Sequence, residues 1–331
     1  MPSSWTSAPL WVDARTLAAT MTVGAAAQHL GEALAAGLDP EGDGQRTRLA
    51  APAGELLLMP SAVGGAVGVK VLTVRSSSQE HAQPVIQGVY ALFDGESLQP
   101  TALLDGAALT ELRTPATSVV ALRSLAPPAV NRVALLGTGL QARAHALACA
   151  DLFPGARLEV LGRRPERVDA LVLELVERGA DARPGQVEAL PAADVVVCAT
   201  GAATPLFAGH LVADHACVVA IGSHHPDRRE VDSALMARST VVVESRTSAL
   251  REAGDVVIPV DEGVLDPDDL VPLSSLLTGG AAPDLGRPRL FKGTGMPWQD
   301  LVVARAVVDE LTARSPDEEV PRPPVPSHPR A

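Results

Sequence analysis

The chain has 331 residues, which is enough for about two domains. Hydrophobic residues make up 47% of it and aromatic residues only 2%, so Ala, Val and Leu must fill the core. The formal net charge of −12 disfavours nucleic acid and anionic membrane surfaces as partners. No apolar run reaches the length of a membrane span, and residues 1–9 lack the features of a signal peptide. The cysteines, Cys149, Cys198 and Cys217, stand in apolar settings, so we expect reduced thiols in a cytoplasmic protein.

The first third of the chain predicts helices followed by a small antiparallel or mixed sheet. A helical pattern runs from Asp13, its N-cap, to Gly37, its stop. A polar loop over residues 39–48 comes next and carries Arg46 and Arg48. Strands are predicted at 55–59, 66–74, 85–93 and 102–104. The Asp94-Gly95 pair between two apolar runs indicates a hairpin.

The rest of the chain alternates strands and helices, which is typical of a doubly wound parallel sheet. A helix over 109–125, closed by Pro127-Pro128, leads into this part. Strands are predicted at 133–136, 157–161, 194–199, 217–221 and 240–244. Helices are predicted at 141–152, 165–178, 208–212, 231–237 and 299–313. Residues 1–9 and 315–331 are expected to be disordered tails.

A glycine-rich turn follows the first of these strands. Gly137 permits a tight turn, Gly139 lets the backbone approach a pyrophosphate, and Ala142 allows close packing of the next helix. The N-terminus of that helix offers free N–H groups and a positive dipole end to phosphates. The spacing predicts a dinucleotide site. A plain structural turn without a ligand is the alternative, because glycine also marks ordinary turns.

The end of the second strand of this sheet carries two cations. An NAD site usually places an acid there to bind the ribose hydroxyls, but here Gly162 is followed by Arg163 and Arg164. This pattern favours the 2′-phosphate of NADP, and solvated arginines at a helix start are the alternative. Glu159 lies inside the strand and is a poor substitute for the missing acid.

Lysine is rare in this chain, which has 27 basic residues but only Lys70 and Lys292 as lysines. Lys70 stands between two valines in an apolar strand, where chance retention of a lysine is a poor explanation. Arg113 lies in a helix and Arg46 on a loop. These three cations can converge on a carboxylate, although each alone is more often a surface residue.

His224 and His225 follow the strand at 217–221, at the sheet edge where ligands bind in this architecture. Adjacent histidines point in different directions and make a poor metal pair, and no zinc spacing is present, so we expect no metal. A general-acid or substrate-contact role for His224 competes with a plain loop histidine.

Taken together, the motifs resemble the ornithine cyclodeaminase and mu-crystallin family, with its archaeal-type alanine dehydrogenases, over roughly residues 40–305. The resemblance rests on Arg46-Thr47, Gly68–Val71, Gln87-Gly88, Leu103–Gly106, Glu111–Thr114, Gly137–Gln141, Gly222–Glu230 and Phe291–Gly295. It implies an α/β fold, with a Rossmann NAD(P)-binding domain over 117–298 and a smaller α+β substrate-binding and dimerisation domain over 10–116 with 299–314. It also implies a homodimer.

The resemblance assigns roles to residues. Arg46, Lys70 and Arg113 would hold the substrate carboxylate. Independently of the resemblance, we expect Lys70 and His224 to be the catalytic residues. By the resemblance, Gly137, Gly139, Gln141 and Arg163 would hold the cofactor. We expect further cofactor contacts from Thr114, Thr138, Arg164, Thr200, Gly222 and Lys292. Gly293 follows Lys292 where the family more usually has Ser, which puts the nicotinamide-side contact in question.

One departure bears on the activity. Cyclodeaminases of the family carry an aspartate where this chain has His224, and a histidine cannot supply a fixed negative charge to a diamine. The resemblance therefore favours reduction of Δ1-pyrroline-2-carboxylate or Δ1-piperideine-2-carboxylate to L-proline or L-pipecolate, with NADPH preferred and NADH possible. Ornithine cyclodeamination, a linear imino-acid or alanine dehydrogenase, and a binding protein that has lost catalysis are the alternatives.

Overall fold

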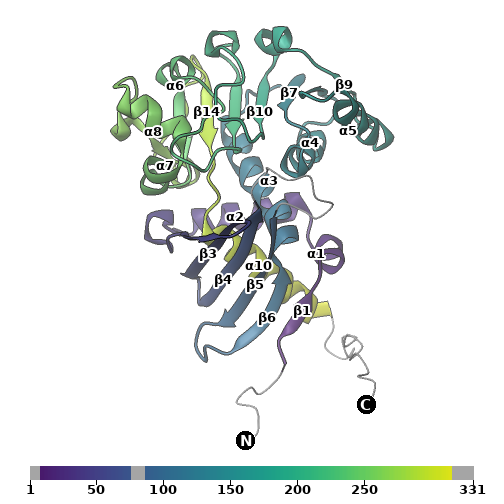
Figure 1. The fold of residues 1–331 in the computed structure, drawn as a ribbon, viewed down its shortest axis with the longest axis vertical. Helices are drawn as coiled ribbons and strands as arrows, with labels where there is room; N and C mark the ends of the chain where they lie inside the picture. Colours follow the sequence, from purple (N-terminus) through teal and green to yellow (C-terminus); the bar gives the residue numbers. More distant parts are fainter. Residues whose placement is uncertain (1–7, 76–85, 315–331) are drawn as a thin grey trace, which may run out of the picture.

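The computed structural model describes residues 8–75 and 86–314, and Figure 1 shows them as two sheet-based parts joined by a central helix. A six-stranded sheet lies in one part and an eight-stranded sheet in the other. Helix α3 (Gly106–Leu125) lies between the two sheets. Apart from residues 8 and 9, the predicted tails lie outside the described residues. None of the helices in the described part of the chain is long and apolar enough to cross a membrane.

The six-stranded sheet is mixed, as predicted. Its strands are β1 (Leu10–Val12), β2 (Thr47–Ala51), β3 (Gly54–Val63), β4 (Ala66–Arg75), β5 (Ile86–Asp94) and β6 (Pro100–Asp105), in the order β1-β6-β5-β4-β3-β2. The pairs from β2 to β6 are antiparallel, whereas β1 runs parallel to β6. The sequence did not predict β1 and β2, because β1 has only three residues and β2 is largely exposed and lacks a clear apolar pattern. The hairpin at Asp94 is confirmed, with the Asp94 carboxylate accepting from the backbone N–H of Ser97.

The N-terminal helical pattern forms two helices rather than one. Helix α1 (Ala14–Thr20) begins after Asp13, whose carboxylate accepts the N–H of Thr16. Helix α2 (Val23–Ala35) starts after Thr22, whose hydroxyl caps the N–H of Ala25. Because Thr22 satisfies a free N–H at this point, a new helix begins there and the prediction of one continuous helix was wrong.

The eight-stranded sheet is parallel throughout. Its strands are β7 (Arg132–Leu136), β8 (Arg157–Leu161), β9 (Ala182–Pro184), β10 (Val195–Cys198), β11 (Cys217–Ala220), β12 (Thr240–Val243), β13 (Val271–Pro272) and β14 (Arg289–Lys292). The order β9-β8-β7-β10-β11 reverses direction between β7 and β10. Ligands bind at such a reversal, outside the carboxyl ends of the strands. The predicted doubly wound sheet is confirmed.

Helices cover both faces of this sheet. They are α4 (Leu140–Leu152), α5 (Pro165–Glu177), α6 (Ser233–Arg238), α7 (Arg246–Glu252), α8 (Gly254–Asp261) and α9 (Leu273–Leu277). The sequence missed α7, α8 and α9, and the predicted helix at 208–212 is a short 3-10 turn, Gly209–Leu211. It also missed the central strand β14, because two buried cations, Arg289 and Lys292, enclose an apolar run of only two residues.

The last helix, α10 (Pro297–Arg314), returns to the six-stranded sheet and packs on β3, β4 and β5 (Figure 1). The predicted domain boundary at 116/117 falls inside α3, which packs on α2 and β5 as well as on α4. This helix thus packs against both parts of the molecule; it begins directly after β6, and residues 126–131 connect it to β7.

The opposite face of the six-stranded sheet is apolar and exposed. Strand register places Leu58, Val89 and Leu103 on this face, with Leu49 and Trp11 at its edges. Each of the five is at least 36% exposed. An exposed apolar surface of this kind is typical of an interface.

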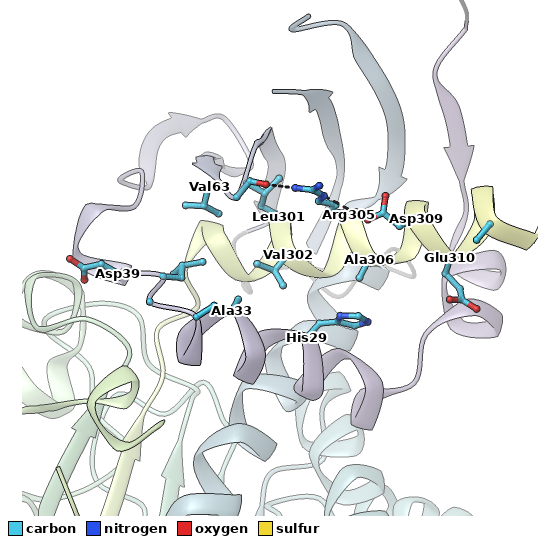
Figure 2. Close-up of a pocket in the computed structure, with 15 residues that line it drawn as sticks. His29, Ala33, Asp39, Val63, Leu301, Val302, Arg305, Ala306, Asp309 and Glu310 are labelled. Carbon is cyan, nitrogen blue, oxygen red and sulfur yellow. Dashed lines mark hydrogen bonds and ion pairs between the residues drawn. The ribbon is translucent and has the colours of Figure 1, made fainter. Parts of the chain in front are cut away.

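A cavity of about 840 Å³ lies on the helical side, between α2 and α10. Figure 2 shows His29 and Ala33 from α2 facing Val302 and Ala306 from α10. Arg305 at its rim donates to the carbonyl of Gly64. None of the predicted site residues lines this cavity.

Candidate active site

The glycine turn after β7 has the geometry that a dinucleotide site needs. Gly137 has φ +125°, and a Cβ there would lie 2.5 Å from the carbonyl oxygen of Ala199, so only glycine fits. Around Gly139 a Cβ would meet nothing within 4 Å, which leaves open space at the N-terminus of α4. No side chain caps that terminus, so its N–H groups face this space. A cavity of about 290 Å³ opens beside Thr138 and Gly139. These features fit a pyrophosphate.

The carboxyl end of β8 is basic. Arg163 and Arg164 are both exposed there, and α5 begins directly after Arg164. Glu159 is buried within the strand and pairs with Arg183, so it cannot reach a ribose at the strand end. The structure therefore places two cations and no competing acid from β8 at the edge where the ribose would lie.

Lys70 and Arg113 converge on one carboxylate, that of Asp300 in α10. The Lys70 Nζ lies 2.8 Å from Oδ1 and 2.7 Å from Oδ2 of Asp300. The Arg113 Nε lies 3.2 Å from the same Oδ1. The side chains of Lys70 and Asp300 have 0% exposure, and that of Arg113 has 6%. Two of the three cations that were predicted to converge on a substrate carboxylate therefore meet on an internal acid, which the sequence did not predict as part of the site, and their contact with a substrate stays a prediction.

The environment changes the proton affinity of Lys70. The pKa of Lys70 is lowered from 10.5 to about 7, chiefly by burial and then by the charge of Arg113, while Asp300 acts in the opposite direction. An ammonium with a pKa near neutrality can both hold an anion and release a proton.

Arg46 joins this cluster from the segment before β2. Its guanidinium pairs with Glu252 of α7 at 2.9 Å and donates to the carbonyls of Thr294 and Gly295. A Cβ on Gly295 would lie 2.6 Å from the Arg113 guanidinium, so Gly295 separates the two arginines by backbone alone. Arg46 thereby fixes the segment after β14 against the six-stranded sheet.

Helix α3 links this cluster to the dinucleotide turn. Thr110 accepts a hydrogen bond from the Lys70 Nζ at 3.2 Å through its hydroxyl. The carbonyl of Thr110 accepts another from the side-chain amide of Gln141, at the start of α4. Thr114, one turn further, donates its hydroxyl to that same carbonyl. The predicted contacts of Gln141 and Thr114 with a cofactor remain predictions, since both side chains engage α3 here.

A second buried acid, Glu230, ties together the loops after β10 and β11. Its carboxylate accepts the backbone N–H and the hydroxyl of Thr200 and the N–H of Gly222, at 2.7–2.8 Å. A Cβ on Gly222 would lie 2.0 Å from the carbonyl oxygen of Thr200, so the two loops touch directly. Both residues thus lie at the predicted cofactor edge, held by an acid to which the sequence assigned no role.

Lys292 is also buried, at the end of β14. Its Nζ lies 3.0 Å from Oδ2 of Asp255, and both side chains have 0% exposure. Asp255 in turn accepts the backbone N–H of Glu230. The Lys292 ammonium therefore supports the Glu230 loop from inside the domain, and its predicted contact with the cofactor stays a prediction.

His224 lies close to the cations, but its protonation state argues against the expected general-acid role. The pKa of His224 is lowered from 6.5 to about 3, chiefly by burial and then by the nearby charges, among them Arg46 and Arg48. At neutral pH the imidazole is uncharged, so it has no imidazolium proton to give. A substrate-contact role is the part of the prediction that this geometry allows.

The prediction that adjacent histidines point apart was wrong. The rings of His224 and His225 lie side by side with centroids 4.7 Å apart. Together with Glu55 they offer ligand atoms that all lie within 4.8 Å of one another. However, Arg48 already pairs with Glu55 at 2.8 Å and donates to the carbonyl of His224, so positive charge lies against this group. That charge disfavours a metal ion there.

The residues that sequence patterns missed are mostly acids. Asp300, Glu252, Glu230 and Asp255 each neutralise or orient a predicted residue. One of these acids could have been found from the sequence: Asp300 interrupts the apolar pattern of the last helix.

Comparisons with known proteins find related sequences and a shared fold. Residues 18–315 match the model of the ornithine cyclodeaminase/mu-crystallin family. A Δ1-pyrroline-2-carboxylate reductase of Bacillus cereus is 32% identical over 278 residues, covering 80% of this chain and 84% of the relative. The ketimine reductase mu-crystallin of Mus musculus is 30% identical over 262 residues, covering 78% and 82%. The solved structure of Thermococcus litoralis Δ1-pyrroline-2-carboxylate reductase in complex with NADH and L-proline shares the fold, with TM-score 0.87, 24% identity and coverage of 94% and 100%.

Proposed function

Because the chain belongs to the ornithine cyclodeaminase/mu-crystallin family, as its motifs predicted, we propose that it is a nicotinamide-dependent reductase of a small cyclic 2-imino acid. Δ1-Pyrroline-2-carboxylate and Δ1-piperideine-2-carboxylate are the proposed substrates, and L-proline and L-pipecolate the products. Relatives that cover most of the chain are reductases of this chemical class. The observation that carries the proposal is the buried Lys70–Asp300–Arg113 cluster.

The cluster suits an anionic substrate. Two cations share the one carboxylate of Asp300, which leaves a positive charge that a substrate carboxylate would balance. Arg113 offers a planar fork that can bind a carboxylate through two hydrogen bonds. Holding the carboxylate fixes where the imine carbon lies, and such positioning lowers the barrier of a transfer reaction.

The proton and the hydride come from different sources. When bound, the nicotinamide supplies a hydride to the imine carbon, and the glycine turn with the N-terminus of α4 would hold its pyrophosphate. Lys70 supplies the proton to the imine nitrogen, because its pKa of about 7 leaves a large fraction as ammonium at neutral pH. The Lys70 amine then takes a proton back from solvent.

NADPH is the proposed preferred cofactor, with NADH accepted more weakly. The support is local: Arg163 and Arg164 are exposed at the end of β8, and Glu159 is buried within the strand. A guanidinium at this point would bind a 2′-phosphate through charge-assisted hydrogen bonds.

The proposed assembly is a homodimer in the cytoplasm. The exposed apolar face of the six-stranded sheet supports a dimer, since a second copy would cover Leu58, Val89 and Leu103. The cytoplasmic setting rests on Cys149, Cys198 and Cys217, which are all free and buried.

The test is a panel of cyclic and linear 2-imino acids assayed with NADPH and NADH. Fast oxidation of the reduced cofactor with a cyclic imine, and slow oxidation with a linear one, is the expected result. Ammonia release from L-ornithine without net change in the cofactor would instead identify a cyclodeaminase and overturn the proposal.

A further inference from the structure

Asp300 contacts both cations at the centre of the site. It enters from α10, whereas Lys70 comes from β4 and Arg113 from α3. Its side chain is fully buried, and its two oxygens lie 2.7–3.2 Å from the two cationic groups. Burying a carboxylate costs desolvation free energy unless the carboxylate is paired. We therefore ask what the Asp300 carboxylate does for the two cations beside it.

Among the described residues that face Lys70, Asp300 alone neutralises it directly. Thr110 and Arg113 face it from α3, Arg46 faces it from the segment before β2, and Tyr90 lies opposite it in β5. Thr110 is uncharged and both arginines are cations. Tyr90 stays uncharged, because burial raises the pKa of its hydroxyl far above the physiological range. Without Asp300, burial and two cations would all favour a neutral amine at Lys70.

We propose that Asp300 is a positioning residue that keeps Lys70 as an ammonium and aims it, together with Arg113, at the substrate. This inference rests on the proposed imine reduction. In that reaction the C=N bond takes a hydride at carbon from the reduced nicotinamide and a proton at nitrogen from Lys70, which is left as an amine and is reprotonated by solvent. Asp300 neither gains nor loses an atom in the step.

The chain offers an unusually direct test, because Lys70 and Lys292 are its only lysines. Protein labelled with carbon-13 at the lysine ε position should give two lysine signals, and the Lys70→Arg variant assigns them. The titration of Lys70 can then be followed by nuclear magnetic resonance in the protein without substrate. In Asp300→Asn, the Lys70 transition should move to lower pH by roughly one to three pH units, the effect of losing a nearby opposite charge.

Three further variants separate charge from structure. Thr110→Val removes the other hydrogen-bond partner of Lys70 without changing charge, so it should move the transition much less. Asp300→Glu keeps the charge and should hold the transition near its wild-type position, while displacing the ammonium and lowering kcat. Asp255→Asn removes the matching buried partner of Lys292 and should leave the Lys70 signal in place.

Kinetics give the second readout. In Asp300→Asn, the loss of kcat on raising the pH should begin at lower pH, by the same amount as the resonance moves, while KM for the anionic substrate does not rise at acidic pH. An unchanged Lys70 transition in Asp300→Asn would overturn the inference. If that variant does not fold, Asp300→Glu decides: a Lys70 transition at clearly lower pH than in the wild type, although the negative charge is kept, would overturn it. If the resonance moves but no imine is reduced by the wild type, the role of Asp300 stands and the proposed function fails.

Discussion

Replacing Lys70 by arginine should slow the chemical step without removing the positive charge. Lys70 has a pKa of about 7 in its buried position. The ordinary pKa of an arginine lies far above that of Lys70, so an arginine here would almost never release its proton. Loss of a general acid typically costs roughly 100- to 10,000-fold in rate. We expect kcat of Lys70→Arg to fall within that range, with a smaller effect on substrate binding, since the positive charge beside Asp300 and Arg113 is kept.

The assay is steady-state reduction of a cyclic 2-imino acid with NADPH, from about pH 6 to about pH 9, a range that brackets the Lys70 pKa of about 7. The wild-type rate should fall as the pH rises, because the ammonium form is lost, and the variant should lose this dependence. Lys70→Met should lose both substrate binding and turnover. Fluorescence titration with NADPH should give similar affinities for all three proteins, since the glycine turn belongs to the other sheet. A Lys70→Arg enzyme that matched the wild-type rate across this pH range would refute proton donation by Lys70.

Three other changes test separate parts of the structure. Arg163→Asp should reverse the preference for NADPH over NADH, because a charge-assisted hydrogen bond of about 1.5–3 kcal/mol is replaced by repulsion; equal affinities in the unmodified protein would contradict the assignment. Leu58→Asp on the exposed sheet face should shift sedimentation at micromolar concentration from dimer to monomer, whereas the matched change at the exposed Leu173 of α5 should not. Burial lowers the pKa of His145 from 6.5 to about 4, so between these pH values the unfolded chain binds a proton at His145 and the folded protein does not. The free energy of unfolding therefore falls by roughly 3 kcal/mol as the pH falls from 6.5 to 4. Stability should therefore rise with pH across this window, and His145→Gln should flatten the rise in thermal unfolding experiments.

Local chemistry decided which parts of the fold could be predicted. Gly137 is required because a Cβ there would clash with the carbonyl oxygen of Ala199. The glycine turn could still be predicted, because the strand before it and the helix after it have strong sequence patterns of their own. Strand β14 could not be predicted from the sequence, because Arg289 and Lys292 are buried cations whose partners lie far along the chain. A pattern of hydrophobicity cannot identify a strand whose ends are charged and yet buried.

The site also contains residues that could be predicted from the sequence and residues that could not. Lys70 could be singled out because a lysine inside an apolar strand is locally anomalous. Asp300 could not be assigned to it, because the two residues are 230 positions apart and the acid lies 187 positions from Arg113. The depressed pKa of His224 also depends on Arg46 and Arg48, which come from the other end of the chain. The Lys70–Asp300 pair forms only when α10 packs on the six-stranded sheet, and the surroundings of His224 form only when the two sheets are brought together.

Both lysines of this chain are fully buried, each against an aspartate. Reagents that acylate exposed amines would therefore find no lysine side chain on the folded surface, and neither would enzymes that modify lysine. Conversely, any lysine acylation of the protein would report an opening of its interior, at Lys70 between α10 and its sheet or at Lys292 beneath the loops at the end of β14. Acylation at Lys70 and at Lys292, detected by mass spectrometry, would therefore measure local opening in the two halves of the molecule separately.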